Sequence, residues 1–306
     1  MAVEAAAGLA TVQELGRQWW LPRRAAGHAA QSTVARDGQV LNSLPAWFAS
    51  LPVDRVTGDD VFRVAEEWGA GRGAAQATKA RVVISLRALF RDLAEAGLVA
   101  DNPASNVKRP KSGRPGRAGR PFAWSEVDRL VAAVGAFRAD LGRVVFTLAH
   151  TGLRWGELVA LQAGDLRDGG QALSVERSQS AGFAVKAPKS GRSRMVPLDR
   201  RVREVLAGLA SGKGHDERLF STPRGLALSR RNFIRDARWA ELAPGHRIHD
   251  LRATWAVHLL DVEGVTSTDI QRWLGHGSLA TTERYVNGLT ASRRDAELRA
   301  ALDRAA

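Results

Sequence analysis

Apolar residues recur at helical spacing through residues 8–100. Two predicted helices cover about 15–20 and 40–48, a third follows Gly58-Asp59-Asp60, and the longest spans about 77–96. In the longest segment, large apolar side chains return every three or four residues and therefore share one face of the helix. The pattern predicts a small all-α domain in which the aromatic side chains belong to the core.

A second region with a mixed pattern follows residue 121. A capping-box-like sequence, Ser125-Glu-Val-Asp128, predicts the start of one helix, a second helix ends at Gly152, and a third begins near Arg154. The spacing of apolar residues then shortens to the period that is typical of β-strands. Three short strands are expected at 173–178, 183–187 and 194–198, the last two joined as a hairpin, and the remainder is helical. The expected fold class is mainly α with a small antiparallel β-sheet.

A basic segment rich in Pro and Gly, residues 102–121, separates the two regions. It contains no acidic residue, and its Pro and Gly break both helical and strand periodicity, so it is expected to be a linker. Taken alone, such a segment is most simply a solvated tether, but an extended chain of like charge also suits a phosphate backbone. Its candidate DNA-contacting side chains are Lys108, Arg109, Lys111, Arg114, Arg117 and Arg120.

Composition narrows the possible functions. The chain has 306 residues and a net charge of +13, so its length suggests two domains and its charge favours a polyanion such as nucleic acid. The absence of Cys excludes a disulfide scaffold, Cys-ligated zinc, iron–sulfur clusters and a Cys nucleophile. No stretch reaches the roughly 18 apolar residues of a membrane span, and no signal peptide is recognisable. We therefore expect a cytoplasmic protein without membrane contact.

The chain contains a single tyrosine, Tyr285, although tyrosine is a common residue in cores and interfaces. It lies in a polar stretch shortly after Leu274-Gly-His276. By itself, such a residue is most simply an exposed aromatic side chain on a helix. Its significance depends on the motifs that precede it.

Two further motifs carry basic side chains on predicted helices. Thr151-Gly-Leu-Arg-Trp-Gly-Glu157 puts Arg154 where backbone N–H groups and the helix dipole favour phosphate. His249-Asp-Leu-Arg252 puts two donors on one helix face. Each also has an ordinary explanation, such as an Arg154–Glu157 ion pair or a core histidine. The His246–His249 pair lacks a third ligand at metal spacing, so no metal is expected.

Together, these motifs resemble those of the tyrosine recombinases, the phage-integrase family. The sequence contains T-G-L-R-x-x-E-L, K-x-x-x-x-R-x-V-P-L, H-x-L-R, and L-G-H followed nine residues later by Tyr, in that order within 122–287. The N-terminal region resembles the core-DNA-binding domain of that family through 57–61, 79–90 and Asn102-Pro103. The resemblance therefore covers nearly the whole chain.

The resemblance implies six catalytic residues, which are Arg154, Lys189, His249, Arg252, His276 and the nucleophile Tyr285. The two arginines would bind the phosphate oxygens, and the lysine would protonate the leaving 5′-oxygen. The first histidine would exchange the tyrosine proton, and the second would donate a hydrogen bond to a non-bridging oxygen. Glu157 would support the cluster, and Arg192 is a further candidate DNA contact. Lys186 is the nearest alternative to Lys189, but its offset from Val-Pro-Leu is less suitable.

The resemblance also implies a two-domain C-clamp. Its parts would be an all-α core-DNA-binding domain at 1–101, the linker at 102–121, the catalytic domain at 122–288 and a C-terminal helix at 289–306. For that last helix, docking on a neighbouring protomer is one hypothesis and packing on its own domain is the other. Ala253 departs from the family, which often has His there, but the position is a supporting one. We also expect no separate arm-binding domain before residue 8, which argues against a full lambda-type architecture.

The implied reaction is site-specific DNA recombination through a 3′-phosphotyrosyl intermediate and a Holliday junction, without ATP, metal or another cofactor. The implied partners are double-stranded DNA with paired half-sites, other copies of the chain in a synaptic tetramer, and accessory directionality or DNA-bending proteins. On DNA, the protein would be associated with the nucleoid. Two alternatives stay open: a DNA-relaxing enzyme like the type IB topoisomerases, and a non-catalytic DNA-binding relative.

Overall fold

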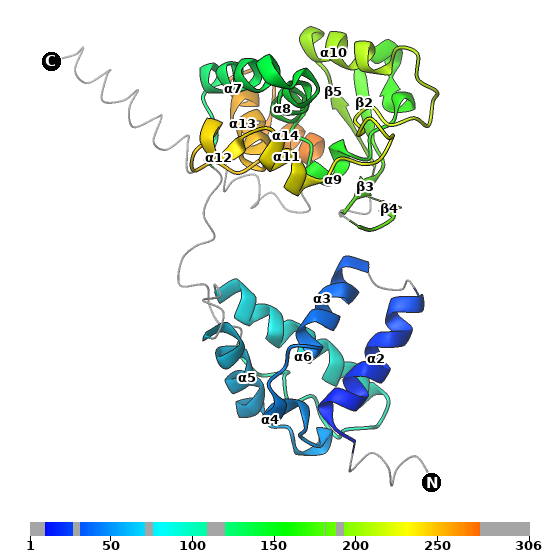
Figure 1. Ribbon diagram of the computed structural model, residues 1–306, viewed down its shortest axis with the longest axis vertical. Helices are drawn as coiled ribbons and strands as arrows, with labels where there is room; N and C mark the ends of the chain where they lie inside the picture. Colours follow the sequence, from blue (N-terminus) through cyan, green and yellow to red (C-terminus); the bar gives the residue numbers. More distant parts are fainter. Residues whose placement is uncertain are drawn as a thin grey trace, which may run out of the picture. The chain divides into compact units, whose positions relative to one another are not determined.

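The computed structural model divides the chain into two compact units, residues 1–117 and 118–306, each with its own hydrophobic core (Figure 1). It describes residues 10–26, 31–70, 76–108, 120–180, 182–187 and 193–275. The predicted fold class, mainly α with a small antiparallel sheet, is confirmed. The predicted domain limits and the clamp around DNA stay predictions. Within the described ranges, every helix is too short or too polar to cross a membrane.

Helices build the described part of the first unit. They are α2 (Val12–Ala26), α3 (Gln31–Leu41), α4 (Ala46–Ala49), α5 (Gly58–Ala70) and α6 (Gln76–Glu95), with a 3-10 turn at Val53–Arg55. The single helix predicted over 40–48 is wrong, because the chain leaves α3 at Leu41 and restarts in α4. Pro45 is the extended N-cap of α4, and a proline disfavours helical geometry in the residue before it.

The aromatic side chains of the first unit divide into two groups. Phe48 and Phe90 are completely buried in the core, as predicted. The tryptophans are only half-buried, since each indole N–H needs a polar partner. Trp19 donates to Asp92 at 2.7 Å and Trp20 donates to the carbonyl oxygen of Val34 at 2.7 Å. The prediction of aromatic core residues therefore holds for Phe48 and Phe90 and only partly for the tryptophans, while Phe62 is 49% exposed.

The start of the predicted linker is held on α6. Arg87 donates through Nε to the carbonyl oxygen of Ala104 at 3.0 Å and through Nη2 to that of Val107 at 2.8 Å. Asn102 donates in return to the carbonyl oxygen of Arg87 at 3.0 Å. Ala104 is completely buried. The segment therefore belongs to the packed part of the first unit as far as Val107.

The described part of the second unit combines helices with two small sheets (Figure 1). Its helices are α7 (Trp124–Phe137), α8 (Ala139–Thr151), α9 (Trp155–Leu158), α10 (Arg200–Ala210), α11 (Arg230–Asp236), α12 (Trp239–Leu242), α13 (Asp250–Leu259) and α14 (Ser267–Leu274). Its strands are β1 (Leu166–Arg167), β2 (Ala172–Val175), β3 (Ser178–Gln179), β4 (Val185–Lys186) and β5 (Arg194–Pro197). Short 3-10 turns lie at Ala163–Asp165 and Asp168–Gly170.

The strand pairing differs from the predicted hairpin. The larger sheet has the order β1-β2-β5, and β5 pairs antiparallel with β2, with Leu173 opposite Val196. The smaller sheet consists of β3 and β4. The expected pairing of 183–187 with 194–198 is therefore wrong. Leu173 and Val196 are both completely buried, so burial of apolar side chains on one face of the larger sheet favours the observed register.

Two predicted helix boundaries also need correction. Helix α7 begins at Trp124, and Ala123 is its N-cap, whose N–H is accepted by the Glu126 carboxylate at 2.8 Å. The helix expected to begin near Arg154 and to carry Leu158, Val159 and Leu161 ends after one turn, at Leu158. The chain then enters the irregular segment that leads to β1. This short helix carries the first part of the candidate site.

Candidate active site

Gly152 makes the sharp turn that presents Arg154. It ends α8 in a left-handed conformation, with φ of +60°. A Cβ at this position would lie 2.4 Å from Cε3 of Trp255, so no other residue fits the turn. The next residue, Leu153, is buried in the core. Arg154 then becomes the N-cap of α9, with its side chain 28% exposed.

Glu157 faces the beginning of its own helix. Its carboxylate accepts the backbone N–H of Arg154 at 2.8 Å and the Nη1 group of the same residue at 2.8 Å. The ion pair that the sequence offers as the ordinary explanation of this motif is therefore present. A carboxylate therefore occupies one backbone N–H of this helix start, which was expected to be open to phosphate.

Glu157 is also shared by two other arginines. Arg194 forms a fork on the carboxylate, with Nη2–Oε2 and Nη1–Oε1 distances of 2.7 and 3.1 Å. Nη1 of Arg252 lies 4.0 Å from Oε2. Burial alone would raise the pKa of Glu157, but the hydrogen bonds and charge of Arg194, followed by the charge of Arg154, outweigh it and lower the pKa to about 2. The carboxylate is therefore ionised at neutral pH and holds three guanidinium groups together.

Arg252 reaches this cluster from α13. Its side chain is 2% exposed, and it donates through Nη1 to the carbonyl oxygen of Gly152 at 2.6 Å and through Nη2 to that of Leu274. Buried charges are tolerated when they are paired and hydrogen-bonded. Arg252 therefore ties the turn before Arg154 to the end of α14.

The C-terminal end of α14 receives all three arginines. The carbonyl oxygens of the consecutive residues 273–275 accept hydrogen bonds from Arg194 Nε at 2.6 Å, from Arg252 Nη2, and from Arg154 Nη2 at 3.2 Å. The last carbonyls of a helix have no partner within the helix and carry the negative end of its dipole, so they attract cations. His276 is the next residue in the sequence.

His249 stands at the N-cap of α13. The side chain is exposed on one side. Partial desolvation, followed by the positive charges of Arg252, Arg154 and Arg247, lowers the pKa of His249 to about 4. The ring is therefore neutral at pH 7, and a neutral imidazole can accept a proton.

Three of the six predicted catalytic residues lie in the described part of the chain, and they come together. These are Arg154, His249 and Arg252, with the predicted supporting residue Glu157 between the arginines. The other predicted site residues fall outside the described residues and stay predictions: Lys189, His276, Tyr285, Arg109, Lys111, Arg114, Arg117 and Arg192. Lys186, the alternative to Lys189, is exposed on β4.

Sequence reasoning missed Arg194 as a member of the cluster. It is the first residue of β5, and along this strand buried and exposed positions alternate, with Arg194 and Val196 on the buried face. A charged residue at the inward-facing position of a strand indicates a buried partner. That signal was available in the R-x-V-P-L motif, but the partner, Glu157, is 37 residues away in the chain.

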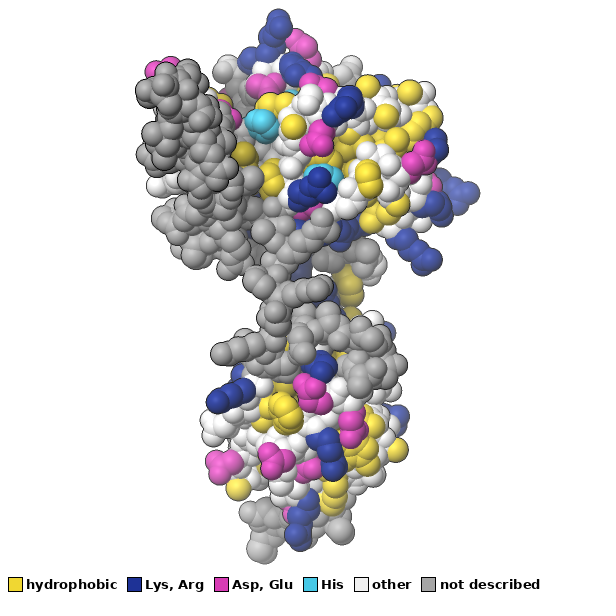
Figure 2. Space-filling view, turned by 90° about the vertical axis from the view of Figure 1, so that its left-hand side faces the viewer, with side chains coloured by type: hydrophobic (Ala, Val, Ile, Leu, Met, Phe, Trp, Pro, Cys, Tyr) yellow, Lys and Arg dark blue, Asp and Glu magenta, His cyan; other side chains and the backbone are white. Residues whose placement is uncertain are grey.

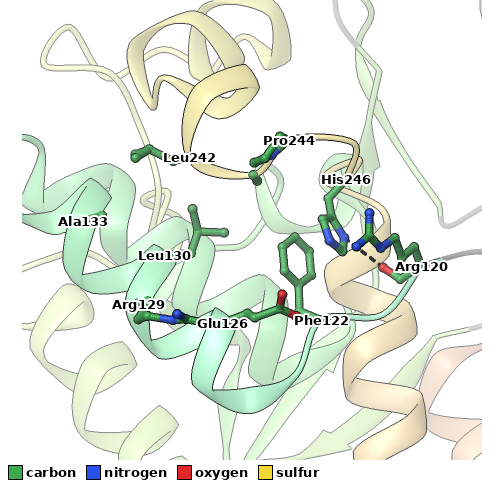
Figure 3. Close-up of a pocket in the computed structure, with 10 residues that line it drawn as sticks. Arg120, Phe122, Glu126, Arg129, Leu130, Ala133, Leu242, Pro244 and His246 are labelled. Carbon is green, nitrogen blue, oxygen red and sulfur yellow. Dashed lines mark hydrogen bonds between the residues drawn. The ribbon is translucent and has the colours of Figure 1, made fainter.

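Two of the predicted DNA-contacting residues of the linker, Lys108 and Arg120, lie in the described part of the chain. Neither belongs to the arginine cluster around Glu157. Lys108 is exposed at the end of the first unit. Arg120 lines a cavity of about 370 Å³ between α7 and the segment after α12 (Figure 3). There the carbonyl oxygen of Arg120 accepts from His246 Nδ1 at 3.0 Å, and the His246 ring stacks on Phe122 at 3.8 Å. His246 is therefore used in packing.

The described surface of both units carries Lys and Arg side chains interspersed with acidic ones (Figure 2). On the face shown, the basic side chains of the described residues are therefore not gathered into a single patch. In the described ranges, no group of three or more His, Asp or Glu side chains is placed to hold a metal ion.

Comparison with known proteins gives consistent matches. The model of the phage integrase family matches residues 124–291. The tyrosine recombinase XerC of Pelobacter propionicus is 30% identical over 271 residues, which cover 83% of this chain and 84% of that protein.

Two solved structures share the fold. The integrase of the transposon Tn1549, in complex with a circular intermediate DNA, has a TM-score of 0.73 at 18% identity, covering 90% of this chain and 94% of that one. A lambda integrase tetramer bound to a Holliday junction has a TM-score of 0.67 at 19% identity, covering 90% and 80% of the two chains.

Proposed function

The chain belongs to the phage integrase family of tyrosine recombinases, and we propose that it is a site-specific recombinase that cuts and rejoins DNA through a 3′-phosphotyrosyl intermediate. The observation that carries this proposal is the cluster in which Arg154, Arg194 and Arg252 surround the single carboxylate of Glu157. Three positive charges against one negative charge leave an excess of two. Such an excess suits a phosphodiester whose negative charge grows in the transition state.

The two arginines with predicted catalytic roles have the chemistry that this reaction requires. A guanidinium stays charged at any physiological pH and presents parallel N–H donors that match two phosphate oxygens. Arg154 is 28% exposed, so a phosphate can reach it, whereas the buried Arg252 stabilises the same site from beneath. Binding by fixed donors lowers the barrier because no solvent has to reorganise during the reaction.

His249 is assigned to the proton of the nucleophile. Its pKa of about 4 in the DNA-free protein keeps the ring neutral, so it can accept the phenolic proton as Tyr285 attacks the phosphorus. A bound phosphate adds negative charge beside the ring and raises its proton affinity. The base is therefore strengthened when the substrate is present.

The remaining assignments follow the sequence motifs. Tyr285 forms the bond to phosphorus, and the 5′-oxygen leaves with a proton from Lys189, so the energy of the phosphodiester is retained in the phosphotyrosyl linkage. His276, which follows the arginine-bound end of α14, would donate a hydrogen bond to a non-bridging oxygen. Attack by a 5′-hydroxyl from a partner duplex then reverses the step without ATP or metal.

The proposed assembly is a tetramer on two paired DNA sites. The structural likeness to a lambda integrase tetramer on a Holliday junction supports it. In this assembly the first unit, the basic linker and the second unit would enclose one half-site, with phosphate contacts from Lys108, Arg120 and the other basic linker residues. Residues 289–306 would dock on a neighbouring protomer. Because phosphate contacts release counterions, binding should weaken steeply with salt.

A suicide substrate tests the proposed function. A nick just downstream of the cleavage position lets the short fragment that carries the free 5′-hydroxyl diffuse away, which traps the covalent protein–DNA adduct. The wild-type protein should form an adduct at Tyr285, identified by mass spectrometry of the linked peptide, and Tyr285→Phe should bind the same DNA without forming one. An adduct formed by Tyr285→Phe would refute the assignment of the nucleophile.

The same experiment separates the alternatives. Binding without any adduct in the wild-type protein would favour a non-catalytic DNA-binding relative. Relaxation of supercoiled plasmid that carries no specific site would favour a topoisomerase-like enzyme. Cleavage restricted to one site, with strand exchange between two copies of it, is the result that a recombinase predicts.

A further inference from the structure

We propose that Arg194 is a positioning residue of this active site, which sets the distance between the two phosphate-binding arginines by joining Glu157 to the end of α14. This inference rests on the proposed function. It assigns a role to a residue outside the six catalytic positions. Its basis is a set of contacts that link three separate elements of the second unit: α9, β5 and α14.

Burial of the charged Arg194 side chain costs free energy. The side chain of Arg194 is 5% exposed, and the other inward-facing residue of β5, Val196, is part of the hydrophobic core. A buried charge is expensive to desolvate, and a well-packed apolar residue often gives equal or greater stability. Packing alone therefore gives no reason for an arginine at this position.

Arg194 forms a bridge between Glu157 and the end of α14. Its two terminal nitrogens bind both oxygens of Glu157 at 2.7 and 3.1 Å, while Nε donates to the carbonyl oxygen of Trp273 at 2.6 Å. The whole fork is thus occupied by protein groups. Arg194 is directed toward α9 on one side and toward α14 on the other, so it fixes these two elements relative to each other.

Both ends of this bridge also bind the arginines with predicted catalytic roles. Glu157 also binds Nη1 of Arg154 at 2.8 Å, so the orientation of this guanidinium depends on the carboxylate that Arg194 holds. The end of α14 binds Arg252 through Leu274 and Arg154 through Gly275. Loss of Arg194 would release Trp273 and remove two of the hydrogen bonds to Glu157, so both phosphate-binding arginines would lose part of their support.

Gly275 gives independent evidence of a close fit. It ends α14 with φ of +65°, in the left-handed region, and a Cβ there would lie 3.1 Å from Cδ of Arg194. The helix end therefore approaches the arginine so closely that a side chain is excluded.

The test measures the rate of adduct formation at saturating suicide substrate, together with DNA affinity and thermal stability. Arg194→Met removes the charge and keeps the volume. The matched control is Arg177→Met, since Arg177 also forms an ion pair with a buried carboxylate of the second unit, Asp165. We expect adduct formation to slow about 10- to 100-fold in Arg194→Met, as for other residues that orient a catalytic group, with DNA affinity nearly unchanged. The control should keep its rate.

A double-mutant comparison distinguishes positioning from general stability. Because part of the effect of Arg194 would act through Arg154 and part through Arg252, adding Arg194→Met to Arg154→Ala should slow the reaction less than it slows the wild type. Equal slowing in both backgrounds would overturn the proposal, and so would a wild-type rate in Arg194→Met.

If Arg194→Met does not fold, Arg194→Lys takes its place. An ammonium group cannot bind both carboxylate oxygens and the Trp273 carbonyl in the same planar arrangement, so we still expect slower cleavage. A wild-type rate for this variant would contradict the proposal. Failure of the wild-type protein to form an adduct would instead contradict the proposed function itself.

Discussion

The two units of the molecule handle buried charge differently. In the first unit, Asp37 is 2% exposed and accepts hydrogen bonds from Ser85 at 2.7 Å and from Arg81 at 3.2 Å. One carboxylate meets one guanidinium, and the pair joins α3 to α6. In the second unit, the carboxylate of Glu157 is shared by three guanidinium groups, and backbone carbonyls supply the remaining acceptors.

This difference indicates what each arrangement is for. A balanced pair has no remaining charge and serves packing. The Glu157 cluster has more positive than negative charge, and it is partly desolvated. Neutral carbonyl oxygens accept hydrogen bonds from its arginines, and a bound anion would add the missing negative charge. The comparison therefore supports the proposal of a phosphate site in the second unit, and each prediction below sharpens or breaks that contrast.

The largest expected effect is on catalysis. Arg252→Ala should slow adduct formation about 1000-fold, because removal of one donor to a developing charge typically costs about that factor. Arg81→Ala removes the balanced arginine of the first unit and should leave the rate at saturating DNA within about threefold of the wild type. The measurement is single-turnover cleavage of the suicide substrate. Similar losses in both variants would remove the contrast between the two units.

The next effect is on stability. Glu157→Gln leaves three guanidinium groups without a counter-charge, so the free energy of unfolding should fall by about 3 kcal/mol. Because the pKa of Glu157 is lowered from its ordinary value of 4.5 to about 2, its ionised form stabilises the fold above pH 4.5, and this contribution is lost as the pH falls from 4.5 toward 2.

Chemical denaturation at several pH values tests this prediction. Glu157→Gln should show a smaller decline in stability between pH 4.5 and pH 3 than the wild type does. Equal declines in the two proteins would show that Glu157 does not carry the buried charge of the cluster.

A smaller effect is expected at the end of α14. Gly275→Ala places a Cβ near Arg194 and requires an alanine at φ of +65°, which costs about 1–2 kcal/mol. Gly97→Ala in the first unit is the matched control, because Gly97 has φ of +72° but nothing within 4 Å of its Cβ position. Both variants should lose stability, and only Gly275→Ala should also slow cleavage. If Gly97→Ala also slowed cleavage, the slower reaction of Gly275→Ala would not be due to the contact between the end of α14 and Arg194.

The smallest effect concerns pH. Because the pKa of His249 is about 4, its ring stays neutral down to about pH 5. Titration of the imidazole C–H signals by NMR, assigned with a His249→Gln variant, should show this low value in the DNA-free protein. A pKa near 6.5, the ordinary value, would contradict the electrostatic influence of the three neighbouring arginines.

The parts of the structure that depend on local sequence were predictable. The long helix α6 and the strands β2 and β5 follow from the spacing of apolar residues, and the motifs around Arg154, His249 and Arg252 identify members of the site. The resemblance also assigned Glu157 to a supporting role, and its contacts agree with that assignment.

The parts that depend on long-range contacts were not predictable. Nothing local shows that β5 pairs with β2 instead of β4, because the register is set by burial across the sheet. Likewise, Glu157 is bound by Arg194, a partner that comes from a distant strand. Three arginines bind consecutive carbonyl oxygens at the end of α14 only in the folded unit. The sequence motif therefore contains Arg194 but does not indicate its role.

The most direct test replaces the phosphate at the cleavage position by a methylphosphonate, which carries no negative charge there. If Arg154 and Arg252 serve to balance that charge, Arg154→Ala and Arg252→Ala should lose about 100- to 1000-fold in cleavage of the phosphate substrate but only a few-fold in cleavage of the methylphosphonate, each relative to the wild type. An equal loss on both substrates would contradict the account, because the arginines would then support the fold and not the charge of the reacting phosphate.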